Sequence, residues 1–288
     1  MDYPIVETTT KDDLPLNGLL LRSKKKDAIL INIHGTAGNF YDEEFTRPIS
    51  ELLLNQGISV LWTNNRGSLV LQAWPLVGSS QERFEDCILD IDAWISYALS
   101  LGYKEIILQG HSIGTEKIVY YMNKGRFRKK VKAIILLSFA DSYGTQMEYV
   151  KSKRNGNALM REAISLVKAG KGRQMLTSDW LARAGLLQQG ADAYMNLFTE
   201  GSELSKALPL RNGKGLPMFW TISVPILAVI GDNEEKEYTI IPIRKAIDLL
   251  KKENANVECH QIKGCDHVYT GKEKVLAGII SSFLRRKT

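Results

Sequence analysis

A pentapeptide with the pattern G-x-S-x-G constrains this chain more than any other feature. It occupies residues 110–114 (GHSIG), after an apolar strand-like run at 104–109 and before a helix-like run at 113–123. Strand, G-x-S-x-G and helix in this order form a nucleophile elbow, in which a sharp turn exposes the serine hydroxyl at the end of a sheet. The glycines are needed because larger side chains would collide with the neighbouring strand and helix. We therefore predict that Ser112 is a nucleophile.

The segments around the elbow alternate between strand-like and helix-like patterns. Runs such as 28–33 and 131–137 are apolar throughout, which is typical of strands buried on both faces of a parallel sheet. Alternating strands and helices predict an α/β fold, with a mostly parallel central sheet flanked by helices. The expected strands are 5–9, 16–22, 28–33, 58–62, 106–108, 131–137, 225–230 and 257–262, and the expected helices are 43–55, 84–99, 113–123, 242–252 and 273–283.

The alternation stops over one long segment, residues 141–220. It has no clear strand and contains amphipathic stretches such as 158–168 and 191–198. We interpret it as a helical cap inserted late in the chain, between two parts of the core at 1–140 and 221–288. A set of aromatic residues could line an apolar pocket under this cap or form the core of the cap itself. They are Trp74, Trp180, Tyr194, Phe198, Phe219 and Trp220.

Composition excludes several classes of protein. The 288 residues are 44% hydrophobic, which is enough for a large buried core. The net charge of +6 is scattered and accompanies no nucleic-acid motif, so no nucleic-acid partner is expected. Three cysteines are too few for a disulfide framework, which favours a reducing cytoplasm. We see no signal peptide, and no apolar run reaches the roughly 18 residues of a membrane span.

Paired carboxylates occur at Glu43-Glu44 and at Asp90 and Asp92. We interpret them as solvated helix surface. No metal-ligand spacing accompanies them, so neither a metal nor a cofactor is predicted.

A serine nucleophile needs a general base, and the base needs an orienting carboxylate. The chain has four histidines. His111 lies in the elbow, where its side chain should point away from Ser112, His34 belongs to an early loop, and His260 lies within an expected strand. His267 lies after the last strand and before the last helix, where the base of such an enzyme belongs. It is the predicted base.

The orienting acid is expected in the loop at 231–235 (GDNEE), after the preceding strand. This loop offers three carboxylates, at Asp232, Glu234 and Glu235. Aspartate is the commoner acid in this role, which favours Asp232. Asp141 could serve only in a rearranged triad.

Two backbone N–H groups should stabilise the negative charge that develops on the substrate oxygen. One is expected from Ile113, which follows the nucleophile. The other is expected from Thr36 in the glycine-containing loop 34–39 (HGTAGN), because glycines let a backbone approach a substrate closely.

Taken in order, these motifs resemble those of the α/β-hydrolase superfamily over nearly the whole chain. The superfamily usually places its acid three residues after the glycine of the acid loop, which favours Glu234 over Asp232. The resemblance implies serine-hydrolase chemistry on the α/β-hydrolase fold. The motifs are 34–36 (HGT), 65–67 (NRG), the elbow, Gly231 with its carboxylates, and Asp266-His267.

The chain is also similar to a poorly characterised bacterial branch of that superfamily, which is distantly similar to fungal siderophore esterases. The residues that carry this similarity are 64–67 (NNRG), 84–87 (FEDC), Asp90-Ile91 and Glu116-Lys117.

The predicted function is cleavage of a carboxylic ester or thioester in a small-molecule acyl substrate. Ser112 attacks, His267 moves the proton, Glu234 or Asp232 orients His267, and water releases the acyl-enzyme. Two alternatives stay open. One is an acyltransferase or cyclising enzyme of secondary metabolism that uses the same residues. The other is a non-catalytic binding protein on a hydrolase fold, which the unusual acid loop suggests.

Overall fold

A computed structural model describes residues 4–25, 27–177, 188–234 and 238–287. The strands of the described ranges are β1 (Ile5–Thr9), β2 (Pro15–Leu21), β3 (Ala28–Ile33), β4 (Ile58–Thr63), β5 (Glu105–His111), β6 (Val131–Leu137), β7 (Ile226–Gly231) and β8 (Val257–Ile262). The helices are α1 (Thr46–Asn55), α2 (Cys87–Ser100), α3 (Ile113–Lys124), α4 (Ser142–Ser152), α5 (Asn157–Lys168), α6 (Ala191–Phe198), α7 (Glu203–Ala207), α8 (Pro217–Trp220), α9 (Ile243–Glu253) and α10 (Glu273–Lys287).

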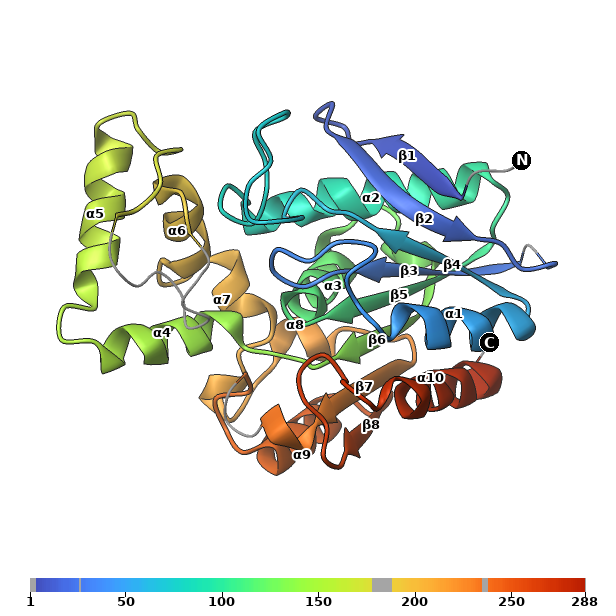
Figure 1. Ribbon diagram of the computed structural model, residues 1–288. Helices are drawn as coiled ribbons and strands as arrows, with labels where there is room; N and C mark the ends of the chain where they lie inside the picture. Colours follow the sequence, from blue (N-terminus) through green and yellow to red (C-terminus); the bar gives the residue numbers. More distant parts are fainter. Residues whose placement is uncertain (1–3, 26, 178–187, 235–237, 288) are drawn as a thin grey trace.

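The strands form one sheet with the order β1-β2-β4-β3-β5-β6-β7-β8 (Figure 1). The strands from β3 to β8 pair in parallel, whereas β1 and β2 join antiparallel at one edge. The predicted α/β fold with a mostly parallel sheet is confirmed. In a parallel sheet the carboxyl ends of the strands share one edge, so the loops after β3, β5, β7 and β8 meet there.

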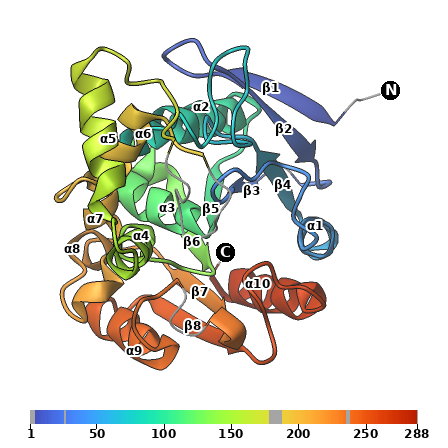
Figure 2. The same cartoon turned by 60° about the vertical axis from the view of Figure 1, so that its left-hand side comes forward.

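The sheet is buried on both faces, as the uninterrupted apolar strands predicted. Side chains alternate along β3, so Ile29 and Ile31 pack with Trp94 of α2 in one core cluster. Leu30 points the other way and packs in a second cluster with Phe283 of α10. Figure 2 shows α1 and α10 together on one side of the sheet and α2 and α3 on the other.

The first helix begins later than expected. The sequence predicted a helix over 43–55, but α1 starts at Thr46. The Thr46 N–H donates a hydrogen bond of 3.0 Å to the carbonyl oxygen of Glu43, which closes a turn before the helix. Glu43 therefore stands outside the helix, and its carboxylate is available to another part of the chain.

The segment between β6 and β7 is helical in its described part, where an isolated bridge joins Met175 to Gly190. Figures 1 and 2 show α4, α5, α6 and α7 grouped on one side of the molecule. The segment has a small core of its own, in which the rings of Tyr194 and Phe198 lie 5.1 Å apart. A second cluster joins Leu197 of α6 to Ile113 of α3. These helices thus pack against the helix that follows Ser112.

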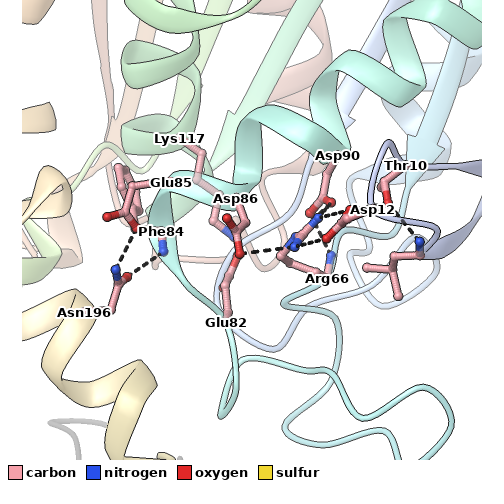
Figure 3. Close-up of polar contacts among 11 residues, drawn as sticks. Thr10, Asp12, Arg66, Glu82, Phe84, Glu85, Asp86, Asp90, Lys117 and Asn196 are labelled. Carbon is pink, nitrogen blue, oxygen red and sulfur yellow. Dashed lines mark hydrogen bonds and ion pairs between the residues drawn. The ribbon is translucent and has the colours of Figure 1, made fainter.

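Side-chain hydrogen bonds also join α6 to the short 3-10 helix Phe84–Asp86, which directly precedes α2 (Figure 3). The Asn196 amide oxygen accepts from the Phe84 N–H at 2.8 Å, and the amide nitrogen donates to Glu85 at 2.7 Å. One side chain therefore ties the helical segment to the core.

Two of the six aromatic residues lie neither in a buried pocket nor in the core of the cap. Trp74 and Trp220 are 90% and 70% exposed. Trp74 lies in a turn closed by the bridge between residues 72 and 77, and Trp220 ends the short helix α8. Phe219 is fully buried in the main core. Trp180 lies outside the described residues.

Among the described residues, no helix combines the length and apolar character needed to cross a bilayer.

The interpretation of Asp90 as solvated helix surface is wrong, because the residue is fully buried. Figure 3 shows its contacts with Arg66. The Arg66 guanidinium donates to one of its oxygens from Nε at 3.0 Å and from Nη2 at 2.9 Å, and the Arg66 N–H donates to the other at 2.9 Å. Arg66 also contacts Asp12 at 3.1 Å and Asp86 at 3.3 Å. Burial raises the pKa of Asp90, and Arg66 opposes that rise. Helical periodicity could not reveal this pair because the partner comes from another loop.

Replacing Arg66 by methionine is expected to lower the free energy of unfolding by about 3–5 kcal/mol, because it leaves Asp90 buried without its cation. The double variant Arg66→Met/Asp90→Leu should recover most of that loss. Urea unfolding measures both. Arg47→Met is the matched control, since Arg47 is 87% exposed and pairs with Glu51 on the surface. That control should leave the stability almost unchanged, because an exposed ion pair contributes little. An equal effect of the two single substitutions would contradict the prediction.

Candidate active site

Ser112 occupies a strained turn between β5 and α3. Its φ of 56° and ψ of −127° are angles that residues with a side chain rarely adopt. A Cβ placed on Gly110 would lie 2.4 Å from the Gly114 carbonyl oxygen, and a Cβ on Gly114 would lie 2.3 Å from that of Ile33. Both glycines of the motif are therefore required by close backbone contacts, as the steric argument from the sequence stated. Strain of this kind concentrates at functional sites.

Glu234 and His267 come together from the loops after β7 and β8. Glu234 Oε2 lies 2.6 Å from His267 Nδ1. The other carboxylate oxygen accepts from the Gly231 N–H and lies within hydrogen-bond distance of Ser138 Oγ, each at 2.9 Å. Glu234 is only 1% exposed. The carboxylate is therefore held on three sides, with one oxygen directed at the imidazole.

Asp232 has a different role from Glu234. Its Oδ1 accepts from the Cys265 N–H at 3.2 Å. A Cβ on Gly231 would lie 2.2 Å from the Cys265 carbonyl oxygen, so only glycine lets the two loops approach this closely. Asp232 and Gly231 thus hold the histidine loop against the acid loop. Glu235 lies outside the described residues.

Asp141 is engaged at the start of α4. It accepts from the Gly144 N–H at 2.8 Å as a helix cap and pairs with Arg211 Nη1 at 2.6 Å. Burial raises the pKa of Asp141, and Arg211 opposes that rise. The neighbouring Glu116 accepts from the Ser142 N–H at 3.0 Å, and burial raises its pKa well above the usual range. Glu116 therefore joins α3 to α4, whereas Asp141 joins the start of α4 to Arg211, and the carboxylate at His267 Nδ1 is that of Glu234.

The loop after β3 lies directly against the nucleophile. A Cβ on Gly35 would lie 3.1 Å from Ser112 Cβ. His34 is fully buried, with Nδ1 2.7 Å from the Gly35 carbonyl oxygen and Nε2 3.0 Å from the Asn65 nitrogen. Burial lowers the pKa of His34 to about 3, so the ring is neutral, donates from Nδ1 and accepts at Nε2. His34 therefore braces the loop that carries Thr36.

Backbone donors beside Ser112 follow from helix geometry. Ile113 is the first residue of α3, and the first N–H groups of a helix have no partner inside it. The N-terminal end of the helix also carries partial positive charge, which favours a developing anion.

Two rings flank the His267 imidazole, and neither was predicted. The Tyr238 ring stacks on it with centroids 3.9 Å apart and planes inclined by 19°. The His111 ring lies 4.9 Å away at 45°. Nothing in the local sequence marks Tyr238, because its loop reaches His267 only through the fold. His111 could have been suspected from its place beside Ser112.

Cys265 lies two residues before His267 in the sequence, but it is not a second candidate nucleophile beside Ser112. Cys265 is fully buried, and burial raises its pKa to about 12, so the thiol stays protonated. Within the described ranges, no three histidine, cysteine, aspartate or glutamate residues gather as a metal site.

Comparison with known proteins identifies the family. A family model described as "Protein of unknown function (DUF1749)" matches residues 23–281. The chain belongs to this family. No curated protein matches it in sequence.

Solved structures show the same fold at low sequence identity. Est1E from Butyrivibrio proteoclasticus, solved with ferulic acid bound, has a TM-score of 0.67 and 17% identity, over 98% of this chain and 99% of its own. The α/β hydrolase GrgF from Penicillium sp. sh18 gives 0.71 and 16%, over 98% of each chain. A monoglyceride lipase from Saccharomyces cerevisiae gives 0.67 and 13%, over 100% and 96%. The chain therefore has the α/β-hydrolase fold that its motifs indicated.

Proposed function

We propose that this protein is a serine hydrolase that cleaves a carboxylic ester or thioester of a small-molecule acyl substrate. The observation that carries the proposal is the 2.6 Å contact between Glu234 Oε2 and His267 Nδ1. A carboxylate on Nδ1 fixes the proton there and leaves Nε2 able to accept one from a serine hydroxyl. The strained elbow at Ser112 supplies such a hydroxyl at the same edge of the sheet.

The reaction has two halves. Ser112 Oγ attacks the acyl carbon while His267 Nε2 takes its proton, and the N–H groups of Ile113 and Thr36 stabilise the oxyanion. The tetrahedral intermediate collapses, and the leaving alcohol or thiol takes the proton from His267. Water then attacks the acyl-enzyme by the same route and releases the acid.

The helical segment between β6 and β7 bounds the acyl side of the site in this proposal and acts as a cap on the core. Its support is the cluster that joins Leu197 and Leu204 to Ile113, the residue after the nucleophile. Proteins of the same fold include Est1E, whose structure holds ferulic acid, and a lipase in complex with a substrate analogue. The pairing of Glu234 with His267 supports the catalytic proposal over the non-catalytic alternative that the unusual acid loop suggested.

Labelling with a fluorophosphonate tests the proposal. The wild-type protein should be modified at Ser112, as located by mass spectrometry. His267→Gln should slow the labelling by about 10³-fold, because the general base is lost. Labelling at another residue, or an unchanged rate without His267, would contradict it. A folded protein that does not react would favour the binding-protein alternative.

His260→Gln is the matched control. His260 also pairs with a glutamate, Glu258 at 2.7 Å, but lies in β8 with 38% of its side chain exposed. The same substitution there should leave the labelling rate unchanged.

Adding an alcohol or amine acceptor to the ester assay distinguishes hydrolysis from acyl transfer by the product formed.

A further inference from the structure

A second histidine–carboxylate pair lies behind the first. His111 Nε2 is 2.8 Å from the main-chain carbonyl oxygen of His267. His111 Nδ1 is 3.3 Å from Oε1 of Glu43, the residue that the late start of α1 leaves outside the helix. The two side chains are 4% and 14% exposed. A buried imidazole therefore stands between a carboxylate and the backbone of the predicted base.

The protonation state of His111 follows from its two neighbours. A carbonyl oxygen and a carboxylate oxygen both accept hydrogen bonds and cannot donate them. The imidazolium form presents an N–H group to both neighbours: Nε2 forms a hydrogen bond with the carbonyl, and Nδ1 makes an ion-pair contact with Glu43 that is not aligned as a hydrogen bond. A neutral ring with its proton on Nε2 would instead turn a nitrogen lone pair toward the carboxylate. Burial by itself lowers the pKa of His111, but Glu43 outweighs it and raises the pKa overall.

The groups that face His111 come from several elements. Besides Glu43, they are the ionisable side chains of His34, Glu234 and His267 and the rings of Phe45 and Tyr269. The nearest carboxylate is that of Glu43, so it supplies the main compensation for the buried positive charge.

We propose that His111 and Glu43 are positioning residues for the catalytic base, with the His111 imidazolium holding the His267 carbonyl and Glu43 holding the imidazolium. This inference rests on the proposed role of His267. Because His111 directly precedes Ser112, its side chain fixes the distance between the end of β5 and the histidine loop. Ser138 Oγ also lies 2.9 Å from the His267 carbonyl oxygen, but it has a single proton and lies equally close to Glu234, so His111 is the donor that serves this carbonyl alone.

The position of this carbonyl matters because the reacting nitrogen belongs to the same residue. A displacement of about 1 Å at a reacting group costs about 100-fold in rate. Loss of the His111 donor should therefore lower kcat for an activated ester and leave KM unchanged, since substrate binding does not involve this contact.

Two substitutions at one position separate positioning from packing. His111→Gln keeps an N–H donor close to the place of Nε2, whereas His111→Phe keeps a ring against Phe45 and Tyr269 but has no donor. We expect His111→Phe to lower kcat by about 10- to 100-fold and His111→Gln to recover most of that loss. A residue that only fills space would give the opposite order, because phenylalanine suits an apolar, ring-lined site better than glutamine does.

The pH profile gives a second readout. The raised pKa of His111 means that its contact with Glu43 is complete below the ordinary histidine value and is lost as pH rises through the raised value. Glu43→Gln removes the carboxylate that raises the pKa of His111, so the fall of kcat at alkaline pH should begin at a lower pH. His111→Gln, which cannot titrate, should lack this fall. Glu44→Gln is the matched control, because Glu44 is exposed, and it should keep the wild-type profile.

The outcomes distinguish this inference from the proposed function. If the fluorophosphonate labels Ser112 but the His111 variants follow the packing order, the hydrolase stands and the positioning role is overturned. If wild-type Ser112 is not labelled, both are overturned.

Nitrogen-15 NMR of the histidine rings gives a measurement that does not depend on turnover. Two protonated nitrogens on His111 at neutral pH support the proposal, and a neutral ring overturns it.

Discussion

Replacing Ser112 by alanine or by glycine is expected to lower kcat for hydrolysis of an activated short ester by about 10⁴-fold or more, because the nucleophile is lost. The two variants should differ in stability. Backbone angles such as those of Ser112 cost about 1–3 kcal/mol for a residue with a Cβ, and glycine adopts them freely. We therefore expect Ser112→Gly to unfold with a free energy about 1 kcal/mol higher than Ser112→Ala.

A serine inside a helix provides the control for this comparison. Ser96 is exposed in α2, where glycine should be about 1 kcal/mol less stable than alanine. The order of alanine and glycine in urea unfolding should thus reverse between the two positions. If alanine is the more stable residue at both, the elbow stores no strain. If Ser112→Ala keeps its esterase activity, Ser112 is not the nucleophile.

Local patterns were sufficient to predict most of the fold. The apolar run of β3 requires burial on both faces, and a parallel sheet with helices on both sides satisfies that requirement. The elbow was predictable because its glycines act on immediate neighbours, such as the contact between Gly110 and Gly114. Contacts within a few residues, or within one strand and its partner, leave a signature in sequence.

Contacts made between distant loops left no such signature. Asp90 was predicted to lie at the surface because it is a carboxylate close to Asp92, and its burial depends on Arg66, which comes from the loop after β4. The Glu43 carboxylate reaches His111 only because α1 starts late. Ser138 meets the acid only where the ends of β6 and β7 lie side by side. The sequence could therefore propose the residues of the site, but not the groups that hold them in place.

Replacing Glu234 by glutamine should lower kcat by about 10⁴-fold, whereas Asp232→Asn should change it little. The amide of glutamine would donate to His267 Nδ1 and move the ring proton to Nε2, which then cannot accept a proton from Ser112. Asparagine at 232 keeps an oxygen that accepts from the Cys265 N–H. Steady-state kinetics on both variants decides between the two acids that the sequence left open. A larger loss in Asp232→Asn would assign the role to Asp232.

The stability of the same variant shows why the chain keeps a charge at this position. Glu234 is almost fully buried, and burying a carboxylate costs free energy that its hydrogen bonds only partly return. Glutamine retains an oxygen to accept from the Gly231 N–H and carries no charge. Glu234→Gln should therefore unfold at an equal or higher urea concentration than the wild type. Lost turnover together with unchanged or increased stability would mean that this carboxylate serves catalysis at the expense of folding.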